Sequence, residues 1–195
     1  MTEHLTGDYW NNRYLNQQTG WDLGEISTPL KQYIDQLADK EIRILIPGCG
    51  NAYEAAYLLE HGFKQVTCID ISPSLCDELE KRLGKSGLRV ICGDFFTHSG
   101  QYDLILEQTF FCALSPALRE NYAKHMASLL PKGGKLAGVL FNCVFEKEGP
   151  PFGGDAGEYR VYFEPFFYLK HFAPCYNSIS PRSGNELFMV LERKG

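Results

Sequence analysis

The stretch Ile42-Arg-Ile-Leu-Ile-Pro-Gly-Cys-Gly-Asn51 decides the fold of this chain. Its first half, residues 42–46, is a short β-branched run that predicts a buried strand. Its second half is a turn containing Gly48 and Gly50, directly before a helical pattern over residues 51–61. Glycines in such a turn let the backbone approach a ligand at a helix N-terminus, where free N–H groups favour an anion. This stretch therefore predicts a strand–turn–helix unit that can hold a ligand.

The same alternation of strands and helices continues along the chain. Short apolar runs predict strands at residues 66–69, 88–92, 102–106 and 135–141. Predicted helices over residues 73–83 and 116–130 begin with Ser-Pro pairs, and a further helical pattern covers residues 159–169. Runs at 172–179 and 186–191 predict a closing hairpin. We therefore expect an α/β, Rossmann-like fold: a mostly parallel sheet with one antiparallel edge strand and helices on both faces.

The first 40 residues do not follow this alternation and predict an N-terminal helical appendage. Trp10 and Tyr14 are four residues apart and share one face of a predicted helix over residues 8–15. Thr28-Pro29 opens a second predicted helix, over residues 28–38. No internal repeat or Pro/Ser-rich linker divides the chain. We predict a single domain over residues 1–195, with an appendage (1–40) and an α/β core (41–195).

Composition argues against several classes of function. The 195 residues include 19 Lys and Arg against 24 Asp and Glu, and the net charge of −5 offers no electrostatic footprint for nucleic acid. There is no membrane-length apolar run and no signal-like N-terminus, so we expect a cytoplasmic protein with no membrane partner. The seven cysteines include no C-x-x-C pair, so we expect no metal site and interpret them as small buried hydrophobes. The oligomeric state stays open, with a monomer slightly favoured.

Acidic residues follow the next two predicted strands. Asp70 ends the second strand, where its carboxylate can accept hydrogen bonds from both hydroxyls of a ribose. Asp94 and Phe95 follow the third strand, where the acid can accept from an adenine amino group beside the ring. Alternatively, Asp70 caps a helix and Asp94 belongs to a structural turn. Tyr53 stands where a dinucleotide fingerprint requires its third glycine, which disfavours a pyrophosphate cofactor.

Glu107 follows the fourth predicted strand, at the sheet edge where ligands bind in open α/β folds. Three roles are open for Glu107. The first is a catalytic acid or base, the second is a partner for the ammonium group of a cofactor, and the third is a buried acid paired with Arg119 or Arg160.

This constellation resembles the class I S-adenosylmethionine-dependent methyltransferases. Additional motifs are similar to those of the thiopurine methyltransferase superfamily, and most of all to its thiol, halide and thiocyanate branch, the "harmless to ozone layer" enzymes. The motifs are Trp10-x3-Tyr14-x6-Trp21-Asp22-x-Gly24-x4-Pro29, Pro47-Gly-Cys-Gly50, Gly93-Asp-Phe-Phe96, Thr109-Phe-Phe-Cys-Ala-Leu114 and Gly149-Pro-Pro-Phe152. The resemblance runs over residues 10–182, nearly the whole chain.

The resemblance implies that S-adenosylmethionine is the cofactor and S-adenosylhomocysteine its product. It also implies a set of cofactor-binding residues: Trp10, Tyr14, Trp21, Gly48, Asp70, Asp94, Phe95 and Gln108. Three positions depart from the family pattern. Tyr14 replaces the usual Trp, Gln108 stands where thiopurine enzymes have Arg and the halide branch often has Tyr, and Phe152 replaces a frequent Tyr. The missing arginine disfavours a thiopurine as the acceptor.

The resemblance further implies methyl transfer to a small soft nucleophile: a thiol, hydrogen sulfide, a halide or thiocyanate. An acceptor that is already anionic needs desolvation and positioning more than it needs a base. Trp10 and Trp21 are candidates for a lid, and the candidates for a dry wall are Phe95, Phe96, Phe110, Phe111, Phe145 and Phe152. Two alternatives remain: an O- or N-methyltransferase that uses Glu107 as its base, and a non-catalytic protein that binds S-adenosylmethionine.

Overall fold

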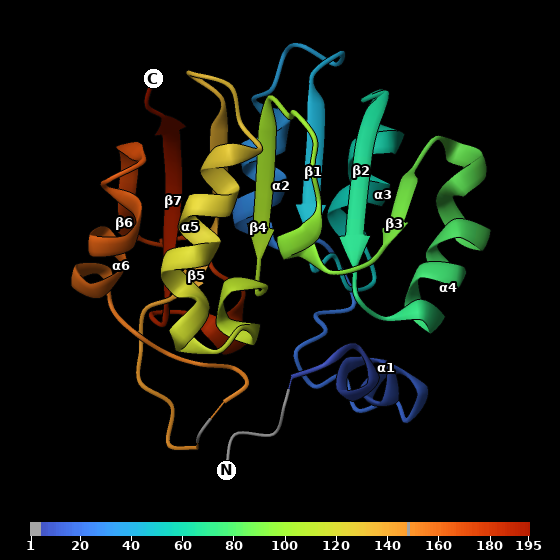
Figure 1. The fold of residues 1–195 in the computed structure, drawn as a ribbon, viewed down its shortest axis with the longest axis horizontal. Helices are drawn as coiled ribbons and strands as arrows, with labels where there is room; N and C mark the ends of the chain where they lie inside the picture. The colour runs from blue at the N-terminus through green and yellow to red at the C-terminus, as the bar shows by residue number, and fades with distance from the viewer. Residues whose placement is uncertain (1–4, 148) are drawn as a thin grey trace.

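In the computed structural model, which describes residues 5–147 and 149–195, seven strands form one sheet in the order β3-β2-β1-β4-β5-β7-β6 (Figure 1). Strands β1 to β5 run parallel, whereas β7 is antiparallel to both β5 and β6. This confirms the predicted fold class, with the antiparallel strand lying next to the edge strand β6. The bounds are β1 (Arg43–Pro47), β2 (Gln65–Asp70), β3 (Arg89–Cys92), β4 (Leu104–Gln108), β5 (Lys135–Phe141), β6 (Phe167–Pro174) and β7 (Glu186–Arg193).

Side-chain caps satisfy first-turn N–H groups at the start of α1, α4 and α6. Ser72 accepts a hydrogen bond at its hydroxyl from the N–H of Leu75 at 3.4 Å, and Asp155 caps the last helix in the same way. The helices are α1 (Gly7–Leu15), α2 (Thr28–Asp35), α3 (Tyr53–Glu60), α4 (Pro73–Leu83), α5 (Arg119–Ser128) and α6 (Ala156–Phe163). Single turns of 3₁₀ helix lie at Gly84–Ser86, Phe95–Thr97, Phe111–Ala113, Pro116–Leu118 and Ser180–Arg182.

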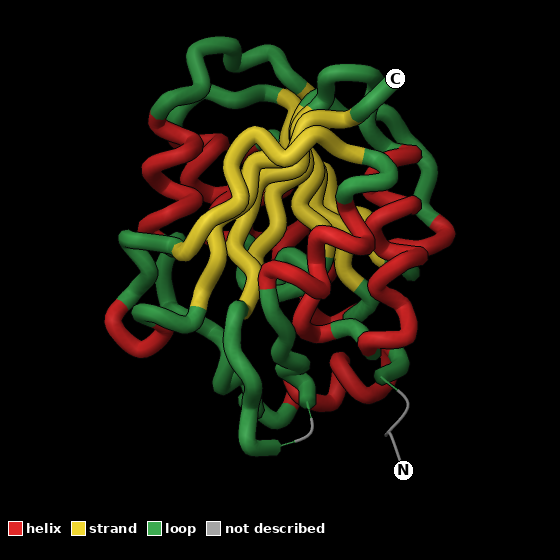
Figure 2. The backbone as a smooth tube through the Cα atoms, turned by 90° about the vertical axis from the view of Figure 1, so that its left-hand side faces the viewer, coloured by secondary structure: helices red, strands yellow, loops and turns green. Residues whose placement is uncertain are grey.

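Helices cover both faces of the twisted sheet (Figure 2). Because successive side chains of a strand point to opposite faces, each strand feeds two cores. In β1, Ile44 and Ile46 pack with α2, α3 and α4, whereas Leu45 packs with α5 and α6. In β4, Leu106 belongs to the first of these cores and Ile105 to the second. The same alternation sets the directions of the side chains at the tip of β4.

The structure corrects the predicted C-terminal elements. The helix predicted over residues 159–169 spans Ala156–Phe163, and residues 167–169 belong to β6. Pro165 disfavours helix at the residue before it, and Phe167 is buried and pairs with Arg193 of β7. Pairing within the sheet therefore overrides the local helical pattern. The predicted strand over 172–179 is shifted for the same reason and ends at Pro174.

The chain crosses from one side of the sheet to the other at β1, which has β2 as one neighbour and β4 as the other. Such a switch point opens a crevice at the carboxyl ends of the strands. Helix α1 lies at this end of the sheet, below the tips of β1 and β2 (Figure 1). In the described residues, no helix is long and apolar enough to cross a membrane.

Candidate functional site

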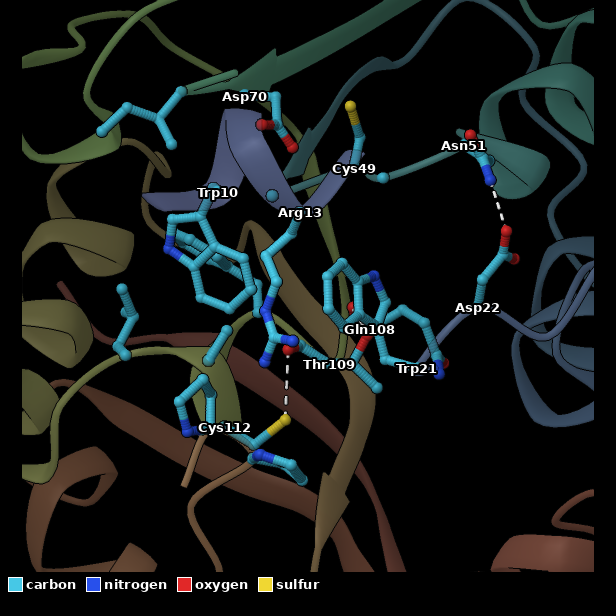
Figure 3. Close-up of a pocket in the computed structure, with 18 of the residues that line it drawn as sticks. Trp10, Arg13, Trp21, Asp22, Cys49, Asn51, Asp70, Gln108, Thr109 and Cys112 are labelled. Carbon is cyan, nitrogen blue, oxygen red and sulfur yellow. Dashed lines mark hydrogen bonds between the residues drawn. The ribbon is translucent and has the colours of Figure 1, made fainter. Parts of the chain in front are cut away.

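A cavity of about 710 Å³ lies at the carboxyl ends of the parallel strands (Figure 3). One side, the strand-tip wall, consists of residues that end strands β1 to β4: residues 48–51, Asp70, Ile71, residues 93–96 and Gln108. The other side, the loop wall, consists of residues 112–114, Leu118, Phe141, Phe145, Pro150, Pro151, Pro181 and Arg182. The structure brings together every predicted cofactor-binding residue on the lining of this cavity: Trp10, Tyr14, Trp21, Gly48, Asp70, Asp94, Phe95 and Gln108.

The turn after β1 needs its glycines. Gly48 and Gly50 have φ values of +56° and +52°, a region that side chains disfavour. A Cβ at Gly48 would lie 2.2 Å from Cδ2 of Phe110, so the ring of Phe110 occupies the space that a side chain would fill. The turn is thus shaped both by its own backbone and by the ring that packs against it.

Asp70 ends β2 and presents a carboxylate to the cavity while being only 8% exposed. Its Oδ1 accepts a hydrogen bond from the N–H of Ser72 at 3.0 Å. Burial raises the pKa of Asp70 to about 6, and nearby backbone N–H groups of Ser72, Gly50 and Ile71 oppose that rise. The carboxylate is therefore ionised at neutral pH, with lone pairs left to accept hydrogen bonds from a ligand.

Asp94 and Phe95 occupy the tip of β3. Oδ1 of Asp94 accepts from the N–H of Phe96 at 2.9 Å, which caps a single helical turn. The ring of Phe95 lies 5.2 Å from that of Phe110, edge to face, and 5.3 Å from that of Phe96. This part of the cavity joins an acceptor group to a set of rings, an arrangement that suits a heteroaromatic base.

The N-terminal segment is fastened onto the core beside this site. Oδ1 of Asn11 accepts hydrogen bonds from the hydroxyl of Ser72 and the N–H of Ser74, at 2.9 and 3.0 Å, which fixes α1 to the start of α4. The ring of Trp21 lies edge-on to those of Trp10 and Tyr14, with centroids 5.5 and 5.9 Å away. These rings form one cluster on the cavity lining.

Gln108, the last residue of β4, lines the cavity and carries a buried amide donor. Its Oε1 accepts a hydrogen bond from the hydroxyl of Ser27 at 3.0 Å, which fixes the amide in orientation. Its Nε2 is buried and has no hydrogen-bond partner among the described residues. A buried donor without a partner is costly, so a ligand acceptor at this position would be stabilised.

Glu107 points away from the cavity and is not part of its lining. This position does not suit a catalytic or cofactor-binding role. It is fully buried, and the alternation of β4 sends it to the same face as Ile105, toward α5. Its carboxylate accepts hydrogen bonds from the hydroxyl of Tyr122 and from the N–H groups of Phe110 and Phe111.

Of the three open roles for Glu107, the buried acid fits, but its partners are not arginines. Arg119 pairs with Glu158, and Arg160 pairs with Glu164. Burial raises the pKa of Glu107 to about 7, against the effect of its three hydrogen-bond donors.

The predicted ring wall is correct in part. Phe95, Phe96, Phe110 and Phe145 line the cavity, whereas Phe111 and Phe152 do not. Phe111 is buried in the core beneath, with its ring edge-on to that of Tyr159.

Phe141, Arg13, Cys112 and Arg182 line the cavity but are absent from the predicted site. Arg13 was detectable, because it lies on the same helical face as Trp10 and Tyr14. The position of Arg182 depends on the path of the loop after β6 and has no local signal.

The cavity can therefore hold a nucleoside-bearing cofactor along the strand-tip wall. Asp70 and Asp94 supply hydrogen-bond acceptors, and Gln108 supplies a donor without a partner among the described residues. The space beside Gly50 is open: the nearest atom to a Cβ added there is Tyr14 Oη, at 3.5 Å. The loop wall carries rings, prolines and a thiol, with Arg182 as its charged residue among the described positions. This side suits a small acceptor kept out of water.

Comparisons with known proteins agree with this geometry. Residues 5–188 match the family model described as thiopurine S-methyltransferase (TPMT). A relative named "Probable thiol methyltransferase 2" from Arabidopsis thaliana is 28% identical over 193 residues, covering 95% of this chain and 84% of its own length. A relative named thiopurine S-methyltransferase from Pseudomonas aeruginosa is 30% identical over 182 residues, with 82% of each chain covered.

The solved structures share the fold. A Burkholderia thailandensis 1,6-didemethyltoxoflavin-N1-methyltransferase, solved with S-adenosylhomocysteine, superimposes with a TM-score of 0.76 at 17% identity. The match covers 97% of this chain and 87% of that chain.

Proposed function

The chain belongs to the thiopurine S-methyltransferase family, and on this premise we propose that it methylates small soft nucleophiles: thiols, hydrogen sulfide, halides or thiocyanate. It is an S-adenosylmethionine-dependent methyltransferase. One observation supports the choice of acceptor above the others. The loop wall has no carboxylate and no imidazole among its described residues: the carboxylates of the cavity belong to the strand-tip wall, to the segment after α1 (Asp22 and Glu25) and to α3 (Glu54).

The strand-tip wall would hold the cofactor. In this proposal Asp70 accepts from the ribose hydroxyls, Asp94 accepts from the adenine amino group, and Phe95 packs beside the base. The buried Nε2 of Gln108 donates to the carboxylate of the cofactor, which satisfies an otherwise unpartnered donor. When bound, S-adenosylmethionine supplies a methyl group activated by a positively charged sulfur.

The residues of the chain then have two tasks, positioning and exclusion of water. Trp10, Tyr14 and Trp21 cover the cofactor from the appendage, which acts as a lid. Phe110, Phe141 and Phe145 strip water from the acceptor, and a soft anion loses less hydration energy there than a hard one. An acceptor held in line with the transferred methyl needs no proton transfer within the protein.

The alternative function is an O- or N-methyltransferase with Glu107 as its base. The geometry disfavours it, because Glu107 does not line the cavity. The carboxylate of Glu107 is bound by Tyr122 and by two backbone N–H groups on the far side of β4. Its role here is to hold the turn that carries Phe110. A thiopurine acceptor is also disfavoured, because Gln108 replaces the arginine of the thiopurine enzymes.

A panel assay with labelled S-adenosylmethionine tests the proposal. The panel contains hydrogen sulfide, iodide, thiocyanate, an aryl thiol, a thiopurine and a phenol. We expect product from the sulfur and halide acceptors and little from the phenol. A clear preference for the phenol would move the protein to the O-methyltransferases.

A further inference from the structure

Arg13 of α1 lines the cavity beside the cluster formed by Trp10 and Trp21 (Figure 3). Its Nη2 donates to the hydroxyl of Tyr9 at 3.1 Å, and its guanidinium carbon lies 6.0 Å from the ring centroid of Trp21. Its Nε is buried and has no hydrogen-bond partner in the described part of the chain. The guanidinium is therefore held in place by rings, with donor capacity left over.

The charges around the cavity single out Arg13. The other charged residues that line it are Asp22, Glu25, Glu54, Asp70, Asp94 and Arg182. Arg182 is already paired, since it lies 3.3 Å from the carboxylate of Glu186 and donates to the carbonyl of Trp21. For Arg13, no carboxylate within 4.0 Å is found among residues 5–147 and 149–195. Arg13 is thus the unpaired cation of the cavity.

We propose that Arg13 is a specificity-determining residue, which pairs with the negative charge of an anionic acceptor. The inference rests on the proposed function, because it takes the acceptor to enter this cavity as a thiolate, halide or thiocyanate. The cofactor is a poor partner for two reasons. Its sulfonium and ammonium groups repel a guanidinium, and its carboxylate already has a donor in Gln108 on the strand-tip wall. The acceptor is the remaining source of negative charge.

This pairing removes a difficulty in the proposed reaction. An anion that enters a cavity walled by rings loses its hydration, and an unpaired charge there is strongly disfavoured. A fixed guanidinium replaces part of the lost hydration and favours the anionic form of a thiol over its neutral form. Neutral acceptors such as phenols gain nothing from it, so Arg13 selects for charge.

The test compares Arg13→Met, which keeps an unbranched stem without charge, with Arg13→Lys, which keeps the charge. Binding of ¹³C-labelled thiocyanate to the complex with S-adenosylhomocysteine is followed by NMR line broadening, which needs no turnover. We expect Arg13→Met to weaken thiocyanate binding by at least about tenfold and Arg13→Lys to stay within about threefold of the unaltered protein. Equal binding by all three proteins, or no binding by any, overturns the inference.

A second arm separates the acceptor from the cofactor carboxylate. S-adenosylhomocysteine and 5′-methylthioadenosine, which lacks the carboxylate, are titrated calorimetrically into each variant. We expect both affinities to change by less than about threefold in Arg13→Met. Selective loss of S-adenosylhomocysteine affinity would show that Arg13 binds the cofactor instead. If the unaltered protein binds thiocyanate through Arg13 but methylates no sulfur or halide acceptor, the proposed function fails and Arg13 is an anion-binding residue that selects no acceptor.

Discussion

The strand-tip wall and the loop wall of the cavity are held by different forces. In the strand-tip wall, Asp70 and Gln108 end strands and are fixed by register, opposite Cys92 of β3 and Val139 of β5. In the loop wall, Cys112 and Arg182 lie in single 3₁₀ turns that depend on individual long-range hydrogen bonds. The carbonyl of Cys112 accepts from the N–H of Phe152 at 2.7 Å.

The loop wall also depends on buried polar groups outside the cavity. Arg119 of α5 is only 2% exposed, donates to the carbonyl of Gly153 at 2.7 Å, and forms an ion pair with Glu158. Glu107 holds the turn at Phe110 from the opposite side. Strand register therefore fixes the strand-tip wall, proposed above as the cofactor site, whereas buried polar contacts fix the loop wall, proposed as the acceptor site. The loop wall can therefore change its specificity without altering the sheet.

The strand-tip wall should show the largest effect of a single substitution on ligand binding. Two charge-assisted hydrogen bonds that Asp70 accepts from ribose hydroxyls are worth about 1.5–3 kcal/mol each, partly replaced by water when lost. We expect Asp70→Ala to weaken S-adenosylhomocysteine binding by roughly 30- to 1,000-fold, measured by calorimetry. Weakening of less than threefold in a folded variant would remove Asp70 from the site.

The pKa of Asp70 adds a control to this test. Hydrogen bonds from ribose hydroxyls favour the carboxylate, and protonation competes with them below a pKa of about 6. We expect cofactor affinity to fall as the pH drops below 6 in the unaltered protein. Asp70→Asn, which cannot titrate there, should lose this dependence.

The strand-tip wall was also the part that the sequence predicts well. Gly48, Asp70 and Asp94 follow short apolar runs, and parallel strands bring their carboxyl ends to one edge of the sheet. The sequence leaves the role of Glu107 open, because both faces of β4 are covered and alternation alone does not say which face turns away from the cavity. Residues of the loop wall, such as Arg182, occupy segments whose path is set by tertiary contacts, so no local pattern identifies them.

Glu107, which supports the turn before the loop wall, should show a large effect on stability rather than on chemistry. Glu107→Ala leaves three donors without an acceptor: the hydroxyl of Tyr122 and the N–H groups of Phe110 and Phe111. We expect a loss of about 2–5 kcal/mol in the free energy of unfolding, measured with denaturant. Glu107→Gln keeps the shape and an acceptor, and its turnover should stay within about tenfold at saturating cofactor. A thousandfold loss of turnover in Glu107→Gln would restore Glu107 as a base.

The pH dependence of stability should separate Glu107→Gln from the unaltered protein. The folded state raises the pKa of Glu107 from 4.5 to about 7, so it holds this proton more tightly than the unfolded state does. Stability from this group is complete below 4.5 and declines as the pH rises to about 7, by up to about 3 kcal/mol. Glu107→Gln cannot titrate, so its unfolding free energy should fall less between pH 5 and pH 8 than that of the unaltered protein.

The appendage joins the two walls, and its attachment should have a moderate effect. Asn11→Ala removes the hydrogen bonds to Ser72 and Ser74 that fix α1. We expect S-adenosylhomocysteine binding to weaken by roughly three- to tenfold. Hydrogen exchange over residues 8–24 should slow on ligand addition in the unaltered protein and slow less in this variant. Asn12→Ala, on the exposed side of the same helix, is the matched control. Ligand-independent exchange in all three proteins would indicate simple packing rather than a lid.

The smallest expected effect is the pH dependence of kcat/KM for iodide, which should be nearly flat. This measurement tests whether the loop wall lacks a base. The kcat/KM for an alkyl thiol should rise with pH toward the pKa of the free thiol, near 8.5, because the thiolate is the reacting form. Iodide is always ionised, so its kcat/KM at saturating cofactor should change by less than about twofold between pH 7 and pH 9. The two profiles differ in the acceptor and share every protein group, so their difference isolates ionisation of the acceptor. If iodide showed the same rise as the thiol, a group of the protein would be titrating, and the loop wall would contain a base that its described residues do not reveal.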